Sequence, residues 1–135
     1  MENVRYVSKN LFIEKLSISN IAKKTGTPCY IYSENQIKEN YTKFVNTFKK
    51  INPLICFAAK SNSNLYILRS LGKLGAGTDV VSAGELLKAL KAGIKANKIV
   101  FSGVGKTEEE LKIAINKKIL LINCESESEA KIINK

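Results

Sequence analysis

The chain contains no histidine among its 135 residues. This absence excludes histidine as a general acid or base, as a metal ligand and as the middle member of a Ser-His-Asp triad. Cysteine is also scarce, because the sequence holds only Cys29, Cys56 and Cys124, far apart and without a C-x-x-C pair. This pattern predicts three reduced, buried thiols in a cytosolic protein rather than a disulfide framework or a zinc site.

Long apolar runs and targeting signals are missing as well. No uninterrupted apolar stretch approaches the roughly 20 residues that are needed to cross a bilayer. The first residues, MENVRY, lack the pattern of a signal peptide. We therefore expect a cytoplasmic protein with no membrane partner.

Arginine is nearly absent, although the formal net charge is +10. Only Arg5 and Arg69 are arginines, and the lysines are spread over every segment in runs of two at most. Proteins that bind nucleic acid usually gather basic residues on one face. The charge pattern therefore indicates a lysine-coated surface rather than a nucleic-acid partner.

Composition and periodicity indicate a globular α/β chain. With 44% apolar and 25% charged residues, the sequence is typical of one folded domain or part of one. A lead-in segment with one strand covers residues 1–32, and short apolar runs alternate with amphipathic stretches through residues 33–135. Expected strands cover residues 29–32, 54–59, 79–81, 99–101 and 119–123. Expected helices begin at the N-cap residues Ser33, Asn64, Ser82, Thr107 and Ser126, and all but the second have Gln or Glu three positions later, as a capping box requires.

This alternation implies a parallel sheet. Four strand-helix units in a row could begin a (β/α)₈ barrel or an open, doubly wound sheet, and the strand pattern does not separate the two. A complete barrel takes about 250 residues. If the fold is a barrel, this chain therefore holds roughly half of it.

The most informative residue is Lys60. It ends the apolar run 53–59 and is followed at once by the polar residues Ser61 and Asn62. In parallel α/β proteins, ligands bind beyond the carboxyl ends of the strands. An amine at that place could form a Schiff base with a carbonyl compound. By position alone, an ordinary solvated strand-end lysine remains open.

Two glycine-containing segments fail as phosphate-binding motifs. The segment GKT at 105–107 ends like a Walker A loop, but the glycine required at position 100 is Val100. The segment GAG at 75–77 could begin a dinucleotide fingerprint, but it leads into a strand, where the fingerprint leads into a helix. Both are interpreted as turns and helix starts.

Five phrases, taken in order, resemble the fold type III pyridoxal-phosphate decarboxylases. They are TPCYIY at 27–32, FAAKSNSN at 57–64, GTDVVSAGEL at 77–86, IVFSGVGKTEEEL at 99–111 and INCESESE at 122–129. Within this family, the third and fourth phrases are most similar to the diaminopimelate decarboxylases. The resemblance implies the N-terminal half of an alanine racemase-like, cofactor-binding (β/α)₈ barrel.

The resemblance also implies a site. Lys60 would carry pyridoxal 5'-phosphate through its amine at the end of the first barrel strand, and Asp79 would lie near this lysine. The implied activity is decarboxylation of an amino-acid substrate, meso-diaminopimelate, to L-lysine by a homodimer. Ser82 and Glu85 are interpreted as capping residues rather than ligands.

Several features of the family are missing from this sequence. A ring-stacking histidine, a glycine-rich phosphate loop and a C-terminal β domain with a catalytic cysteine have no counterpart in it. We therefore expect a fragment that is inactive alone: either a truncated or split enzyme that works only if a separately encoded second half supplies the rest, or a decayed remnant. Alternatives are an ornithine or arginine decarboxylase, an alanine racemase, a non-catalytic cofactor-binding relative, or a basic binding module that is not an enzyme.

Overall fold

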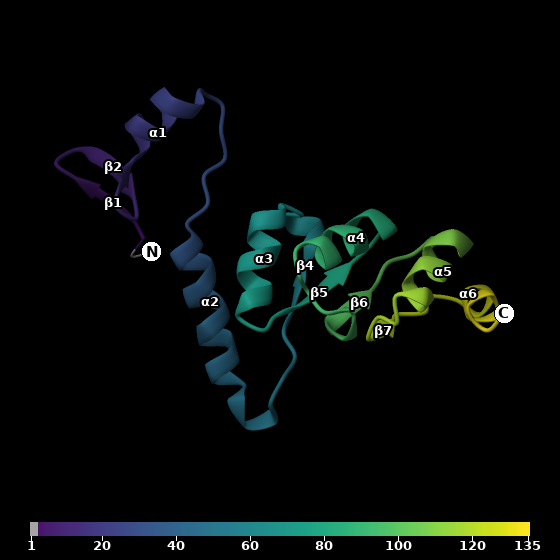
Figure 1. Ribbon diagram of the computed structural model, residues 1–135. Coiled ribbons are helices and arrows are strands. Elements are labelled where there is room, and N and C mark those ends of the chain that lie inside the picture. The colour runs from purple at the N-terminus through teal and green to yellow at the C-terminus, as the bar shows by residue number, and fades with distance from the viewer. Residues whose placement is uncertain (1–2) are drawn as a thin grey trace. The chain divides into compact units, whose positions relative to one another are not determined.

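The computed structural model describes residues 3–135 (Figure 1). The chain divides into two compact units, and the boundary in sequence falls between Phe44 and Val45. None of the helices formed by residues 3–135 is long and apolar enough to span a membrane.

The first unit contains a three-stranded antiparallel sheet. Its strands, in the order β1-β2-β3, are β1 (Val4–Val7), β2 (Asn10–Ile13) and β3 (Leu16–Ser17). Val7 pairs with Asn10, so only Ser8 and Lys9 form the turn between β1 and β2. Both have positive φ, 46° and 65°, as a type I′ hairpin turn requires. The sequence analysis did not predict this sheet, because Ser-Lys is not the Asn-Gly or Asp-Gly signal of such a turn.

Two helices follow in the first unit. They are α1 (Ile18–Thr25) and α2 (Glu34–Thr47), whose last residues belong to the second unit. The segment 29–32 between them forms no strand, so the predicted lead-in strand is wrong. The run CYIY has strand-like composition, but it finds no partner strand among the described residues, and pairing rather than composition makes a strand.

Glu14 ties the sheet to the start of α2. Its carboxylate accepts hydrogen bonds from the Ser33 hydroxyl at 2.6 Å and from the Asn35 backbone N–H at 3.1 Å. These two bonds, in that order, lower the pKa of Glu14. Ser33 also accepts from the Gln36 backbone N–H at 3.0 Å, which confirms Ser33 as an N-cap. The Gln36 side chain donates to Asn40 instead of completing the expected capping box.

The second unit is a four-stranded parallel sheet covered by helices. The strands, in the order β4-β5-β6-β7, are β4 (Cys56–Ala58), β5 (Gly77–Val80), β6 (Ile99–Phe101) and β7 (Leu121–Ile122). The helices are α3 (Leu65–Lys73), α4 (Ala83–Lys91), α5 (Glu108–Asn116) and α6 (Glu127–Ile133), with 3₁₀ turns η1 (Lys49–Ile51), η2 (Ala59–Ser61) and η3 (Ala96–Lys98). Each strand pairs with the next one along the chain. The predicted series of four strand-helix units is confirmed.

The predicted N-caps of these helices are confirmed. Asn64, Ser82, Thr107 and Ser126 each accept a hydrogen bond from a backbone N–H of the first helical turn. Only Thr107 forms a complete capping box, in which the Glu110 side chain accepts from the Thr107 backbone N–H at 3.1 Å. At α4 and α6 the predicted capping box is wrong in one of its two contacts, because the acidic side chain does not accept from the backbone N–H of the N-cap residue. There the acid accepts from the residue before the N-cap, Val81 for Glu85 and Glu125 for Glu129.

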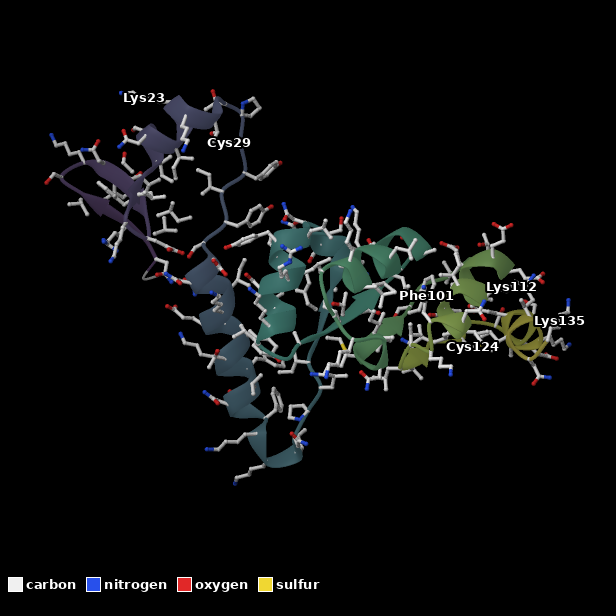
Figure 2. The ribbon with its side chains drawn as sticks, viewed as in Figure 1. Lys23, Cys29, Phe101, Lys112, Cys124 and Lys135 are labelled. Carbon is white, nitrogen blue, oxygen red and sulfur yellow. The ribbon has the colours of Figure 1, made fainter. Side chains whose placement is uncertain are left out.

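The apolar core lies between the sheet and its helices. Val80, Phe101 and Ile122 occupy one row of the sheet, and Val80 and Phe101 are fully buried. They join a cluster with Leu68 of α3 and Leu86 of α4. Figure 2 labels Phe101, which is buried in this unit, and Lys112 of α5, which is exposed. The side chains in alternate rows of the sheet belong to its other face.

The cysteines differ from the prediction of buried thiols. All three are free. Cys29 and Cys124 are exposed and only Cys56 is half-buried, so the prediction is wrong for the first two. Cys29 lies in the irregular segment and Cys124 lies beyond the end of β7, where the core does not reach.

Gly77 opens β5 where no side chain fits. A Cβ atom at this position would lie 2.4 Å from the Lys98 carbonyl oxygen and 2.7 Å from Cys56 Sγ. The backbone oxygen cannot move without disturbing β6. Gly84, in α4, has its nearest neighbouring atom, Ser82 Oγ, at an ordinary 3.8 Å.

We therefore expect Gly77→Ala and Gly84→Ala to have opposite effects on the free energy of unfolding. Gly77→Ala should lower it by about 1–3 kcal/mol through overpacking. Gly84→Ala should raise it by roughly 0.5–1 kcal/mol, because alanine favours the helix. Urea denaturation followed by circular dichroism measures both. Equal effects of the two substitutions would contradict the assigned crowding at Gly77.

Thr78 gives a second stability test. Its side chain is fully buried, and its hydroxyl has no hydrogen-bond partner among residues 3–135. A buried hydroxyl without a partner costs about 1–3 kcal/mol. Thr78→Val should therefore raise the free energy of unfolding by about 1 kcal/mol, whereas Thr78→Ser, which keeps the hydroxyl and loses a methyl group, should lower it. A loss of stability in Thr78→Val would show that the hydroxyl is bonded in solution.

Candidate functional site

The register of the sheet brings four polar residues to one edge. Asp79 lies in the row Ala58–Asp79–Val100–Leu121, on the face opposite to the helix-packed row. Three polar residues follow the other members of this row at a distance of two positions. Lys60 follows Ala58, Ser102 follows Val100, and Asn123 follows Leu121. The carboxyl ends of β4, β5, β6 and β7 therefore carry an amine, a carboxylate, a hydroxyl and an amide.

Lys60 lies in the 3₁₀ turn η2 directly after β4. Ala59 beside it is fully buried in the core, whereas Lys60 is exposed. The Ser61 hydroxyl donates to the Ala58 carbonyl at 2.8 Å and closes the turn. Among residues 3–135, the Lys60 amine has no hydrogen-bond or ion-pair partner. The strand end thus presents an accessible, unpartnered amine.

Two other lysines of this unit, Lys88 beside the loop after β4 and Lys98 at the opposite end of the sheet, are held differently. Lys88 of α4 donates to the Ser63 hydroxyl at 3.0 Å, and Lys98 donates to the Gly75 carbonyl at 2.8 Å. Lys88 thus holds α4 to the loop after β4, and Lys98 holds the 3₁₀ turn before β6 to the turn before β5. Lys60 is the free amine of this group.

Asp79 is held by a relay of two hydrogen bonds. The Ser102 hydroxyl donates to Asp79 Oδ1, and the Asn123 side-chain amide donates to Ser102 Oγ at 2.9 Å. Ser102 is half-buried, and the relay runs across the ends of three neighbouring strands. The sequence analysis missed Ser102 and Asn123, although both follow an apolar strand as Lys60 does.

The negative charge of Asp79 also acts on Cys56, which lies on the same face of the sheet at the start of β4. Cys56, at the start of β4, has its pKa raised, first by burial and second by the negative charge of Asp79. Asp79 therefore places a negative charge on this face of the sheet, in the strand next to β4. An amine or a protonated nitrogen at the end of β4 would be attracted to that carboxylate.

A buried lysine supports the same edge. The Lys106 side chain is 1% exposed, and its amine donates to Glu129 Oε1 at 2.8 Å in a buried ion pair. It also donates to the carbonyls of Gly103 at 2.6 Å and Asn123 at 2.7 Å. Its amine lies 5.8 Å from the centre of the Phe101 ring. In the sequence, this lysine belonged to the rejected phosphate loop and to the fourth family phrase, and no role was predicted for it.

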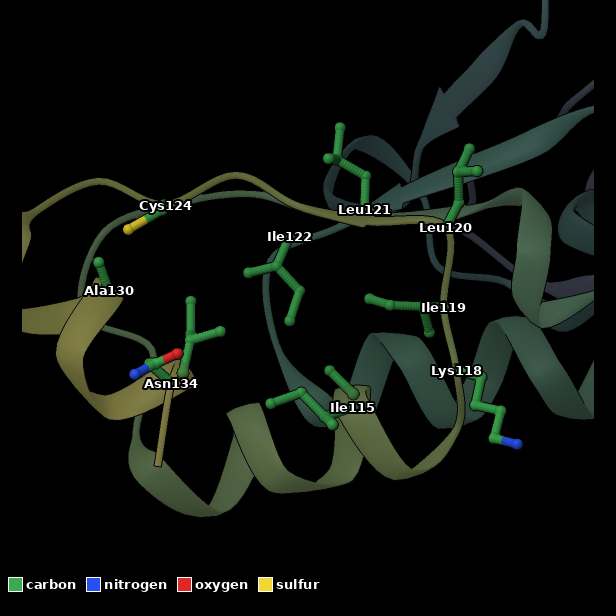
Figure 3. A pocket seen from close by; sticks show the side chains of 11 residues that line it. Ile115, Lys118, Ile119, Leu120, Leu121, Ile122, Cys124, Ala130 and Asn134 are labelled. Carbon is green, nitrogen blue, oxygen red and sulfur yellow. The ribbon is translucent and has the colours of Figure 1, made fainter.

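A groove of about 640 Å³ lies beside β7, but it is apolar (Figure 3). In this view Ile115, Ile119 and Ile122 point into it, while Leu120 and Leu121 point away on the other side of the strand. None of the residues that line the groove is acidic. It is an incompletely covered part of the core rather than a candidate for chemistry.

Comparison with known proteins identifies the family. The family model "Pyridoxal-dependent decarboxylase, pyridoxal binding domain" matches residues 34–135. The chain belongs to this family. Pyridoxal phosphate is accordingly the cofactor of the family, and the fold agrees with the resemblance seen in the sequence.

Two curated relatives similar to the chain are diaminopimelate decarboxylases. The enzyme from Aquifex aeolicus is 46% identical over 131 residues, which cover 97% of this chain and 31% of the relative. The enzyme from Pseudomonas fluorescens is 45% identical over 129 residues, with coverage of 96% and 31%. The chain thus spans about a third of the length of the curated relatives it matches.

A solved structure of a similar decarboxylase has the same fold over nearly the whole of this chain. Diaminopimelate decarboxylase from M. jannaschii, in complex with L-lysine, superimposes with a TM-score of 0.95 at 40% identity, covering 98% of this chain and 32% of that one. The parallel strand-helix units of this chain correspond to the N-terminal part of the barrel in such decarboxylases. This match decides between the barrel and the open sheet that the strand pattern left open.

The residues at the strand ends fit a pyridoxal cofactor. A pyridoxal aldehyde needs a reachable primary amine, which the exposed and unpartnered Lys60 supplies. A cationic nitrogen formed there needs a nearby anion, and Asp79 stands in the adjacent strand one row below. The donor set is therefore chemically suited to covalent attachment of an aldehyde cofactor.

The ion pair between Lys106 and Glu129 predicts how stability depends on pH. The hydrogen bond from Lys106 is the largest cause that lowers the pKa of Glu129 from its ordinary value of 4.5, and the bond from the Glu125 backbone is second. The unfolded chain therefore binds more protons than the folded chain just below pH 4.5. The stabilisation by Glu129 should be complete above that pH and should be lost as the pH falls toward the folded-state pKa.

Glu129→Gln should remove this part of the pH dependence. At neutral pH it should also cost roughly 3 kcal/mol, because Lys106 loses its buried counter-charge. Glu125→Gln is the matched control, since that side chain has no partner among the described residues. Chemical denaturation at a series of pH values measures both variants, and an unchanged pH profile in Glu129→Gln would contradict the assignment.

Proposed function

We propose that this chain supplies the cofactor-binding lysine of a pyridoxal-phosphate-dependent decarboxylase that converts meso-diaminopimelate to L-lysine and CO₂. One observation carries the proposal: an exposed amine without a partner, Lys60, ends the first parallel strand of a chain 46% identical to a diaminopimelate decarboxylase. The M. jannaschii relative was crystallised with L-lysine, which is the proposed product. Because the chain spans about a third of its relatives, the activity of the whole protein is part of the proposal.

Lys60 would hold the cofactor covalently through its Nζ atom. The buried Ala59 fixes the base of the turn, and the bond from Ser61 to the Ala58 carbonyl closes it. The amine therefore extends from a rigid point of the sheet rather than from a loose loop. The bound pyridoxal ring supplies an electron sink for the pair left on the substrate α-carbon when CO₂ departs.

Asp79 would set the charge around Lys60. A carboxylate near the amine favours the positively charged form of the nitrogen by charge pairing. The Ser102 hydroxyl and the Asn123 amide restrain this carboxylate from the next two strands. Asp79 would therefore act as a fixed counter-ion on the cofactor side of the sheet.

Three other lysines of the second unit are poor substitutes for Lys60. Lys88, Lys98 and Lys106 each donate to an oxygen of another segment. A covalent bond at any of them would break a contact that joins two segments of the fold. This difference supports Lys60 as the attachment point.

Borohydride reduction of the purified chain with an equimolar amount of pyridoxal phosphate tests the proposal. The phosphopyridoxyl group should be found by peptide mass spectrometry mainly on Lys60, because its amine combines exposure with a nearby carboxylate. Lys60→Ala should abolish the dominant labelled peptide. Lys73→Ala, which removes an exposed lysine of α3, is the matched control and should leave it unchanged.

The contrary outcome is labelling scattered over many surface lysines in similar amounts. If that pattern is the same in the wild-type chain and in Lys60→Ala, Lys60 has no special reactivity. The family's site would then not be formed by this chain.

A further inference from the structure

The three donors of the Lys106 amine are all satisfied within the fold. They go to Glu129 Oε1, the Gly103 carbonyl and the Asn123 carbonyl, at 2.6–2.8 Å. An ammonium group has three N–H donors, so none remains for a ligand. Lys106 is therefore built into the fold, and its effect on any site must pass through these partners.

Two of the partners are attached directly to the relay that holds Asp79. Gly103 follows Ser102 in the chain, and its φ of 97° is one that glycine adopts readily. Asn123 contributes its carbonyl to Lys106 and its side-chain amide to Ser102. Lys106 thus fixes the backbone of Asn123 and that of Gly103, the residue after Ser102.

The relay has a defined direction. Because the Asn123 amide donates to Ser102 Oγ, the serine oxygen is occupied as an acceptor and its own hydrogen is directed to Asp79 Oδ1. If the loop after β7 moved, Asn123 would withdraw and the serine hydroxyl could rotate. The orientation of the Asp79 carboxylate therefore depends on the position of the Asn123 backbone.

We infer that Lys106 is a positioning residue: its ion pair with Glu129 and its two carbonyl contacts lock the loops after β6 and β7, so that Ser102 and Asn123 keep the Asp79 carboxylate oriented for a cofactor on Lys60. This inference rests on the proposed function for the role of Asp79. The buried charge pair is then more than a stabilising contact, because it links α6 to the strand ends.

A double-mutant cycle separates positioning from stability. The measured quantity is the fraction of Lys60 labelled by pyridoxal phosphate and borohydride, divided by the fraction of Lys73 labelled in the same sample. Ser102→Ala and Lys106→Met should each lower this ratio about ten-fold, as expected for loss of a hydrogen bond to a charged group. Ser102→Thr, which keeps the hydroxyl, should restore it.

The same substitutions are then made in an Asp79→Asn background. If Lys106 acts through Asp79, Lys106→Met should lower the labelling ratio no further there, since coupled residues are not additive. The melting temperature should fall in both backgrounds, because a purely structural loss does not depend on Asp79. An equal drop of the ratio in both backgrounds, or an unchanged ratio in folded Lys106→Met, would overturn the inference. If Lys106→Met does not fold, Glu129→Gln takes its place in the cycle.

A measurement without cofactor keeps this inference distinct from the proposed function. In the ¹⁵N spectrum of the wild-type chain, the Asn123 side-chain amide, assigned with Asn123→Asp, should differ from exposed asparagine amides. Lys106→Met should move it to the exposed position. An Asn123 signal that Lys106→Met leaves in place overturns the inference. Scattered wild-type labelling together with the expected Asn123 shift refutes the role of Lys60 and upholds the positioning of Asp79.

Discussion

The second unit depends on the burial of one face of four short parallel strands. Val80, Phe101 and Ile122 share a row that packs against the helices, and this packing fixes the register of β5, β6 and β7. A slip of one residue would turn the apolar row outward. Because the register is fixed, Asp79 and the polar residues that follow β4, β6 and β7 gather at one edge. The candidate site is thus a consequence of how the core is buried.

A buried charge completes that edge. Removing a lysine amine from water is costly unless every donor is satisfied. Lys106 meets this requirement with one carboxylate and two carbonyl groups, and it does so at the loops that carry Ser102 and Asn123. The same contacts that make the burial tolerable also join the last helix to the strand ends. The hydrogen bonds of Lys106 therefore contribute both to the stability of the fold and to the geometry of the site.

Local signals in the sequence predicted the parts of the second unit well, and long-range contacts account for the errors. The N-caps at Ser82 and Thr107 depend only on the residues that follow them, and both are confirmed. The expected strand at 29–32 needed a partner strand that the described residues do not provide. The hairpin of β1 and β2 was missed because its turn, Ser8-Lys9, takes positive φ without the usual glycine or asparagine.

The sequence by itself determined the order of strands and helices in the second unit, the position of Lys60 and Asp79 at strand ends, and the resemblance to the family to which the chain belongs. These features follow from the local periodicity of the sequence and from short sequence motifs. Only the tertiary structure revealed the relay from Asn123 through Ser102 to Asp79, the free state of the Lys60 amine and the burial of Lys106 against Glu129. The partners in these contacts lie about 20 residues apart in sequence, and they meet because parallel strands align their carboxyl ends.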